Sequence, residues 1–346
     1  MAAMTTSRLS FRSGCSTRAR RCGCSTNWQH RLLFAVVMNA SRTLRREDTA
    51  HWSIAAENDV GRLRGFEVLT LYDGGRTGWL EALRVHPRHR GQGLATSLQS
   101  GLVALACDAL GLARVRYTTG SGNVASRRLA ARCGLSVVAS WGVLMPRRRV
   151  PVAAEAAKVR AARLRVVGGR RRRAKEADES CAEVEARPVG ATELLDFAGR
   201  GGLRFLLQSY WKAYDFDGAN LEMLLRTHEP PLVTSEAPGG RVTSLSWAYH
   251  QRDALGLTVF ATVYTERLAC TLGHLEAQLV RATEAGADAV MLMYDARLEP
   301  ELHALGLAER AEERGGEGGG GGGAAGAESG GGRAPKLCLL FERSFG

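Results

Sequence analysis

Residues 79–109 constrain this chain more than any other stretch, because a strand-like run passes through a tight turn into an amphipathic helix. The run ends at Val85, Pro87 interrupts it, and Gly91 and Gly93 precede the helix. The predicted helix carries an apolar stripe of Leu94, Leu98, Leu102, Leu105 and Ala109. Glycines let a backbone approach an anion, and the N–H groups of a first helical turn point at it. The arrangement therefore predicts a pyrophosphate site.

The turn differs from two common nucleotide-binding motifs. A Gly-x-Gly-x-x-Gly motif would need a glycine where Thr96 stands, and a Walker loop would need a Gly-Lys-Ser/Thr sequence that does not follow. The remaining pattern is Arg-x-x-Gly-x-Gly, from Arg88 to Gly93. By itself this pattern is a weak signal, since any tight strand-to-helix turn uses glycine.

Roughly residues 50–145 resemble the GNAT N-acetyltransferases, which take their acetyl group from acetyl-CoA. Arg88 to Gly93 match the family's pyrophosphate segment. A second segment, Asn123-Val-Ala-Ser-Arg-Arg-Leu-Ala130 followed by Gly134-Leu135, is similar to the family's second motif at the same spacings. The signature thus occurs twice in the expected order, and it implies an α/β GNAT fold with a mixed central sheet flanked by helices.

The resemblance also implies which residues bind acetyl-CoA. The backbone of the third strand would hold the pantetheine arm, through Leu83, Arg84 and Val85. The turn and first helical residues would hold the pyrophosphate: Arg88, Arg90, Gly91, Gln92, Gly93, Leu94 and Ala95. Asn123 is the asparagine of the second motif and is also expected to cap a helix, and the two roles are compatible.

One position departs from the family pattern. Family members often carry a tyrosine that protonates the departing CoA thiolate, and Ala130 stands there in this chain. Either another group such as Tyr117 or water supplies the proton, or catalysis is weaker.

Glu81 is the candidate general base, because an amine must be neutral to attack a thioester. With a period of two it shares a strand face with Leu83 and Val85, and apolar neighbours would raise the pKa of its carboxyl. A salt-bridged strand carboxylate is the equally weighted alternative. His86 and His89 flank the turn and are expected to be solvent-facing loop residues.

A narrower resemblance concerns the acceptor. The string from Glu81 to Val85 and a Leu-Glu-Pro-Glu-Leu stretch at residues 298–302 are similar to the histidine N-acetyltransferases, which act on the α-amine of free L-histidine. The resemblance implies a small-molecule amine acceptor and no metal. Two alternatives stay open, namely a CoA-binding pseudoenzyme and a protein or polyamine N-acetyltransferase.

Four regions are predicted along the chain: a basic disordered arm or transit peptide at 1–46, an acetyl-CoA-binding domain at 47–146, a basic linker at 147–187, and a cofactor-free GNAT-like lobe at 188–346 with a glycine-rich insertion at 315–332. Predicted strands cover residues 52–57, 65–72, 78–85, 242–250, 257–264, 289–294 and 336–345. GNAT domains usually begin with a strand and two helices. Residues 32–38 could form that strand, but the two helices do not fit before residue 52.

Charge and composition bound the partners. The net charge is +12, yet residues 1–46 hold nine arginines and no acid, and residues 147–175 hold twelve basic residues against Glu155 alone. The predicted folded parts are therefore net negative, which argues against nucleic acid as the partner. No apolar run reaches the ~20 residues of a membrane span. Cys22 and Cys24 have no matching pair at zinc spacing. The expected location is the cytoplasm, or an organelle if the arm is a transit peptide, and a homodimer is left open.

Overall fold

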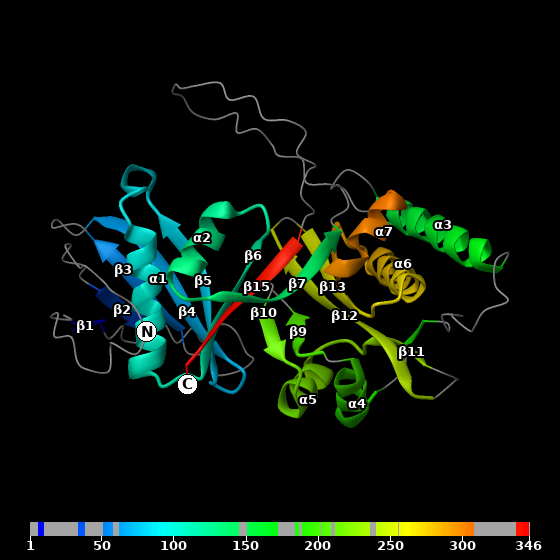
Figure 1. Cartoon of the computed structure of the whole chain (residues 1–346), viewed down its shortest axis with the longest axis horizontal. Coiled ribbons are helices and arrows are strands. Elements are labelled where there is room, and N and C mark those ends of the chain that lie inside the picture. Colours follow the sequence, from blue (N-terminus) through cyan, green and yellow to red (C-terminus); the bar gives the residue numbers. More distant parts are fainter. Residues whose placement is uncertain are drawn as a thin grey trace, which may run out of the picture. The chain divides into compact units, whose positions relative to one another are not determined.

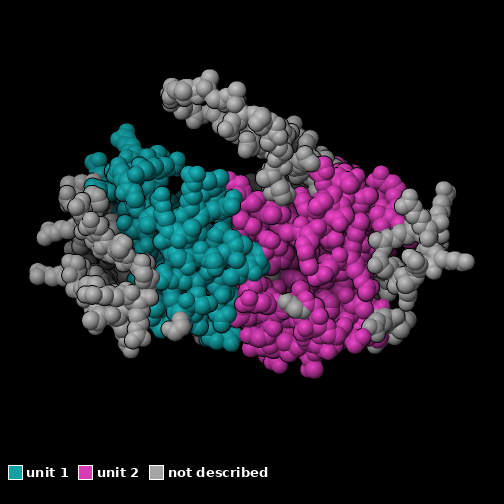
Figure 2. All heavy atoms as spheres, in the orientation of Figure 1, with its two compact units in different colours: residues 1–119, 123–139, 340–346 teal, residues 120–122, 140–339 magenta. Residues whose placement is uncertain are grey.

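The computed structural model (Figure 1) describes the following residues: 6–9, 34–38, 51–57, 62–144, 151–171, 184–186, 189–201, 203–208, 212–235, 240–254, 256–307 and 337–345. The chain divides into two compact units, shown in different colours in Figure 2. Unit 1 comprises residues 1–119, 123–139 and 340–346, and unit 2 comprises residues 120–122 and 140–339.

Unit 1 is built on a mixed sheet. In spatial order its strands are β1 (Thr6–Leu9), β2 (Phe34–Met38), β3 (His51–Glu57), β4 (Leu63–Tyr72), β5 (Thr77–Val85), β6 (Arg114–Gly120), β15 (Leu337–Ser344) and β7 (Ser136–Leu144). Pairing is antiparallel from β1 to β5 and parallel between β5 and β6. Residues 73–75 form the β4–β5 hairpin turn, where positive φ angles at Asp73, Gly74 and Gly75 reverse the chain.

Helices cover one face of this sheet. Between β5 and β6 lie the 3₁₀ turn η2 (Pro87–His89), α1 (Leu94–Ala104) and the π-helical turn η3 (Leu105–Ala109), and α2 (Val124–Arg132) follows β6. Helix α1 packs on β3, β4 and β5 (Figure 1). Leu98 and Leu102 of the predicted stripe are fully buried, as is Leu69 of β4. Burial of each such side chain stabilises the fold by about 1.5–3 kcal/mol.

The strands of unit 2 also pair in both parallel and antiparallel directions. Starting from its residues of β7, the strand order continues with β14 (Ala289–Asp295), β13 (Gly256–Tyr264), β12 (Val242–Asp253), β11 (Leu232–Ser235) and β8 (Glu185–Ala186). A separate hairpin pairs β9 (Phe205–Gln208) with β10 (Lys212–Asp215). The helical elements are α3 (Val152–Arg171), α4 (Ala191–Gly201), α5 (Gly218–Thr227), α6 (Leu268–Glu284), the 3₁₀ turn η4 (Ala296–Leu298) and α7 (Glu299–Ala304).

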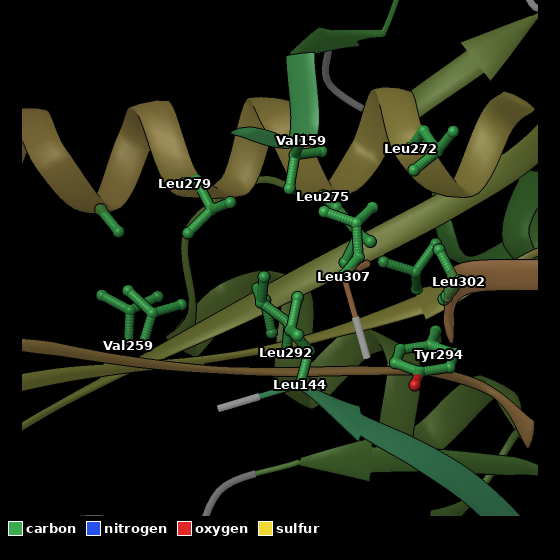
Figure 3. Packing of buried hydrophobic residues seen from close by; sticks show 14 of the residues in the cluster. Leu144, Val159, Val259, Leu272, Leu275, Leu279, Leu292, Tyr294, Leu302 and Leu307 are labelled. Atoms are coloured by element: carbon green, nitrogen blue, oxygen red, sulfur yellow. The ribbon is translucent and has the colours of Figure 1, made fainter. Parts of the chain in front are cut away.

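The main core of unit 2 lies between α6, α3 and the sheet (Figure 3). Leu272, Leu275 and Leu279 of α6 are fully buried there, one or two turns apart on one face of the helix. Val159 and Ala162 of α3 are also fully buried in this core or against it. The predicted linker at 147–187 therefore contains a packed helix. The arginine-rich composition of this segment suggested a solvated linker. A few alanine and valine residues on one face of the helix are nevertheless enough to pack against the core.

Most predicted strands are confirmed, with boundaries shifted by a few residues. Strand β2 covers most of residues 32–38, and it pairs antiparallel with β3, so the segment 1–46 includes strands rather than only a disordered arm. The last strand is divided, since residues 340–346 belong to unit 1 and not to the C-terminal lobe. The predicted glycine-rich insertion at 315–332 lies outside the described residues.

Candidate active site

Strands β5 and β6 part in the middle of the unit 1 sheet. Both strands are fully described, and their pairing joins residues 77–79 to residues 114–116. Strand β5 continues to Val85 and β6 continues to Gly120, but beyond these positions the two strands no longer pair with each other. The β6-facing backbone of residues 80–85 is therefore an unpaired edge that an extended ligand could pair with.

A bulge in β5 lies beside this opening. Residue Ala82 has φ +58°, and the register with β4 shifts between Phe66 and Val68. Two residues of β5 thus stand opposite Glu67 of β4, which bends the strand and strengthens its local twist. The bulge accounts for strand separation at the level of Glu81 to Arg84.

The turn after β5 presents a helix N-terminus to the open end of the strands. His86 begins η2, and its Nδ1 accepts a hydrogen bond from the Arg88 backbone N–H at 3.3 Å. Gly91 and Gly93 adopt φ angles of +76° and +77°, which a residue with a Cβ adopts only at a cost. Gly93 is the N-cap of α1 and provides no side-chain hydrogen bond to it. The first-turn N–H groups of α1 are thus left for another acceptor.

Charge near this helix end favours an anion. The first turn of α1 carries no acidic residue, so nothing opposes the positive end of the helix dipole. Arg88 and Arg90 are exposed in the turn. Arg84 is exposed on β5, and its Nη1 donates a 2.9 Å hydrogen bond to the carbonyl of Leu83.

These features fit the two ends of acetyl-CoA. The two left-handed glycines have open space where a Cβ would project, so a pyrophosphate can approach the backbone. The unpaired edge of β5 can accept and donate hydrogen bonds to the amides of a pantetheine arm. The predicted cofactor residues from Leu83 to Ala95 therefore lie together, on a strand edge and the turn that follows it.

Helix α2 places the second motif on the same side of the sheet as α1. Asn123 caps α2, since its Oδ1 accepts a hydrogen bond from the Ser126 N–H at 3.1 Å. Ala130 is fully buried, so the site of the family's tyrosine holds only a methyl group. The hydroxyl of Tyr117, on β6, instead donates to the carbonyl of Ser126 at 2.9 Å, and its ring stacks on Phe341.

Glu81 lies on the opposite face of the sheet from these helices. It pairs with Val68, and it accepts a 2.5 Å hydrogen bond from the hydroxyl of Thr70. Its side chain is partly exposed, so the apolar neighbours predicted for it do not seal the carboxyl from solvent.

Two buried polar residues beneath α1 escaped the sequence analysis. Glu67 is 2% exposed, and burial raises the pKa of its carboxyl to about 8. Gln99 of α1 is also 2% exposed. Glu67 Oε2 and Gln99 Nε2 find no hydrogen-bond partner among the described residues. The signal was present, because Gly65, Glu67 and Leu69 alternate on the buried face of β4.

Comparison with known proteins shows which family this arrangement resembles. Residues 17–135 match the model of the acetyltransferase (GNAT) family, which covers the β5–turn–α1 site and α2. This part of the chain is therefore similar to GNAT acetyltransferases. No curated protein matches the chain.

Solved structures similar to the chain include other acetyltransferases. A GCN5-related N-acetyltransferase from Sphaerobacter thermophilus is 15% identical, with 84% of this chain and 80% of that chain covered and a TM-score of 0.45. A variant of the spermidine N-acetyltransferase from Vibrio cholerae is 19% identical, with 26% and 53% covered and a TM-score of 0.25. The chain spans about half the length of the latter. At these TM-scores neither likeness carries an argument about what this chain acts on.

The remainder of the described chain adds no second site of this kind. In unit 2, β13 pairs in parallel with β14 from Thr258 to Thr262, so little of β13 is left unpaired. The loop from β13 into α6 contains no glycine, and α6 begins after Arg267. Within the parts that the structure describes, no group of three or more His, Cys, Asp or Glu side chains could hold a metal ion. The described helices are all too short or too polar to cross a membrane.

Proposed function

We propose that this chain is an acetyl-CoA-dependent N-acetyltransferase that acts on a primary amine of a small molecule. The observation that carries the proposal is the strand pair that opens directly before a helix with two left-handed glycines at its start. An unpaired strand edge and a free helix N-terminus are complementary to a pantetheine arm and a pyrophosphate.

Glu81 is proposed as the general base. Its carboxyl stands on the face of β5 away from the helices, and Thr70 fixes its orientation through the hydrogen bond at 2.5 Å. An amine that binds on this face would lose its proton to Glu81, directly or through one water, as its nitrogen attacks the thioester carbon. The peptide groups of residues 83–85 would orient the thioester, and residues 88–95, with Asn123 nearby on α2, would hold the phosphates.

Free L-histidine is the leading acceptor within this proposal, because the strand string from Glu81 to Val85 is similar to the histidine N-acetyltransferases. Polyamines form the second class to test, because a polyamine N-acetyltransferase is one of the alternatives that the sequence leaves open.

The experiment follows CoA release by the purified chain against a panel of amino acids, including L-histidine, and polyamines. Release that depends on one amine supports the enzyme and names its substrate class. CoA binding without release under any amine supports the pseudoenzyme alternative, in which the site is retained and acetyl transfer is lost.

A glycine variant tests the site itself. Replacing Gly93 by valine should weaken CoA binding by at least tenfold, because a β-branched residue at φ +77° must shift the first turn of α1. The matched control is Gly111→Val, which places the same strain at φ +61° beyond the other end of the helix. Equal affinities of both variants for CoA, measured by calorimetry, would contradict the site assignment.

A further inference from the structure

The helix-side face of the β5–β6 opening holds polar groups that the proposed function leaves unused. Glu67 on β4, Gln99 on α1 and Tyr117 on β6 come from three different elements. Glu67 and Gln99 each have a buried polar atom without a hydrogen-bond partner in the described structure. A buried donor or acceptor without a partner lowers the stability of the fold by about 1–3 kcal/mol. A ligand that forms hydrogen bonds with these atoms would offset this cost.

The positions of the three residues converge on the opening. Glu67 stands opposite the bulge of β5, where that strand has left β6. Tyr117 is the first residue of β6 beyond the last paired position, Arg116. Burial is the main cause that raises the pKa of Tyr117, and charge on Glu67 raises it further.

We propose that Glu67 is the general acid that protonates the departing CoA thiolate, with Gln99 and Tyr117 as its positioning residues. This inference rests on the proposed acetyl transfer. In the family, a tyrosine on the helix that corresponds to α2 often protonates the thiolate, and this chain has the buried Ala130 at that position. Here a residue of β4 would donate the proton instead.

The step balances as follows in atoms and electrons. The amine nitrogen forms a bond to the thioester carbon and loses its proton to Glu81 or to water. The carbon–sulfur bond breaks, and its electron pair goes to sulfur. Glu67 transfers its carboxylic proton to that sulfur, which gives the CoA thiol and leaves Glu67 as a carboxylate. Water returns a proton to Glu67 before the next turnover.

The surroundings keep Glu67 protonated between turnovers. Helix α1 carries no titratable side chain, and the arginines of α2, Arg127, Arg128 and Arg132, are exposed. The pKa of Tyr117 on β6 responds to charge on Glu67, and burial raises that pKa above its ordinary value, so the phenol is neutral at pH 7. Burial without a cation raises the pKa of Glu67 to about 8, close to the pH at which an acid works best.

Acid and base then act from opposite faces of the sheet. Glu81 pairs with Val68, and adjacent residues on a strand point to opposite faces, so Glu67 faces the helices while Glu81 faces away. Two carboxyls with different environments can hold different protonation states at one pH. The amine would approach from the Glu81 face and the thiolate would leave on the Glu67 face.

Glu67→Gln is the decisive variant because it keeps the size of the side chain and removes the acid. We expect kcat to fall by about 10²-fold or more, with CoA affinity changed less than threefold. Wild-type kcat should decline above about pH 8 as Glu67 loses its proton, and that decline should be missing in the variant. The control is Thr77→Val, which removes another unpartnered buried hydroxyl from β5 at its closed end and should leave kcat unchanged.

A second measurement does not depend on turnover. Folded Glu67 keeps its proton up to about pH 8, while the unfolded chain loses it near the ordinary value of 4.5. The wild type should therefore lose stability relative to Glu67→Gln as the pH rises from 4.5 to 8, as seen by denaturant unfolding. A constant difference across this range would overturn the protonated state that the proposal requires.

The outcomes separate the two proposals. Wild-type turnover with an unchanged Glu67→Gln variant overturns the role of Glu67 alone. Loss of activity in Tyr117→Phe, with Glu67→Gln unaffected, would make the phenol the acid and also overturn it. A wild-type chain that releases no CoA with any amine defeats the proposed function and, with it, this step.

Discussion

At the scale of single residues, the two glutamates of the site differ in their burial. Glu67 and Glu81 occupy neighbouring strands at nearly the same level, yet one is sealed under α1 and the other is partly exposed. Burial disfavours the charged form of Glu67, whereas Glu81 is partly exposed and accepts a hydrogen bond from Thr70. The same residue type can therefore serve as an acid on one face and as a base on the other.

Replacing Glu81 by glutamine should lower kcat by about 10²- to 10⁴-fold near neutral pH, because the amine then has no positioned proton acceptor. The loss should shrink at high pH, where free amine is already abundant. The measurement is kcat against pH for both proteins. A loss of the same size at every pH would assign Glu81 a structural role instead.

At the scale of elements, α3 shows how a basic segment becomes part of a core. Its Val159 is fully buried beside α6, while Leu164 of the same helix is 65% exposed. Arg160 and the half-buried Arg163 form ion pairs with the largely buried carboxyl of Glu276 on α6. Partly exposed pairs of this kind add little stability, so apolar packing holds the helix in place.

Val159→Ala should destabilise unit 2 by about 1.5–2.5 kcal/mol, since it removes two buried methyl groups and leaves a small cavity. Leu164→Ala is the matched control on the exposed side and should change stability by less than about 0.5 kcal/mol. Denaturant unfolding of both variants compares the two values. Equally small changes in the free energy of unfolding for the two variants would show that α3 does not contribute to the core.

The two parallel strand pairs predict the binding stoichiometry. In unit 1, residues 80–85 of β5 are unpaired with β6, whereas in unit 2 the β13–β14 pairing continues to Thr262 and Met293. A closed pair offers no edge to a pantetheine arm. Calorimetry should therefore give one molecule of CoA per chain, and a value near two would show that unit 2 retains a site.

At the scale of the whole molecule, each unit buries a titratable group, and the two groups respond to pH in opposite directions. His274 of α6 is fully buried, and its ring nitrogens hydrogen bond to Ser244 and Ser246 of β12. Burial, aided by charge on Arg163, lowers the pKa of this imidazole to about 3. Glu67 of unit 1 has its pKa raised to about 8 by burial.

Unit 2 should lose stability as the pH falls from about 6.5 toward 3. In this range His274 binds a proton in the unfolded chain but stays neutral in the folded chain. The expected slope is about 1.4 kcal/mol per pH unit. Unit 1 should lose stability as the pH rises from 4.5 to 8. Calorimetric scans across pH 4–8 should therefore move the transitions of the two units in opposite directions.

Variants assign each transition. His274→Gln should flatten the acid dependence of unit 2, even if its overall stability drops through lost contacts with Ser244. Glu67→Gln should flatten the alkaline dependence of unit 1. Both transitions moving together in every protein would contradict the assignment of the two groups to separate units.

The sequence predicted the local elements of the site well, and it predicted the packing of charged segments poorly. Gly91 and Gly93 predicted the turn, and Asn123 predicted a helix cap. The structure has the turn and the cap at these residues. The helix at residues 152–171 was not predicted, because its arginines suggested a linker. The burial of Glu67 was not predicted either, although it lies among the alternating residues of β4. Burial of a polar residue depends on which element covers it, and that information is absent from its own strand.

The amino-acid sequence by itself determined the strand–turn–helix that begins at Thr77, because glycine geometry and apolar periodicity act over a few residues. It also determined the alternation of strands and helices that makes both units mixed α/β structures. Only the tertiary structure decided that β5 bulges at Ala82 and parts from β6, and that residues 340–346 return to unit 1. Only it buried Glu67 and Gln99, since contacts between distant segments are set by packing and not by local preference.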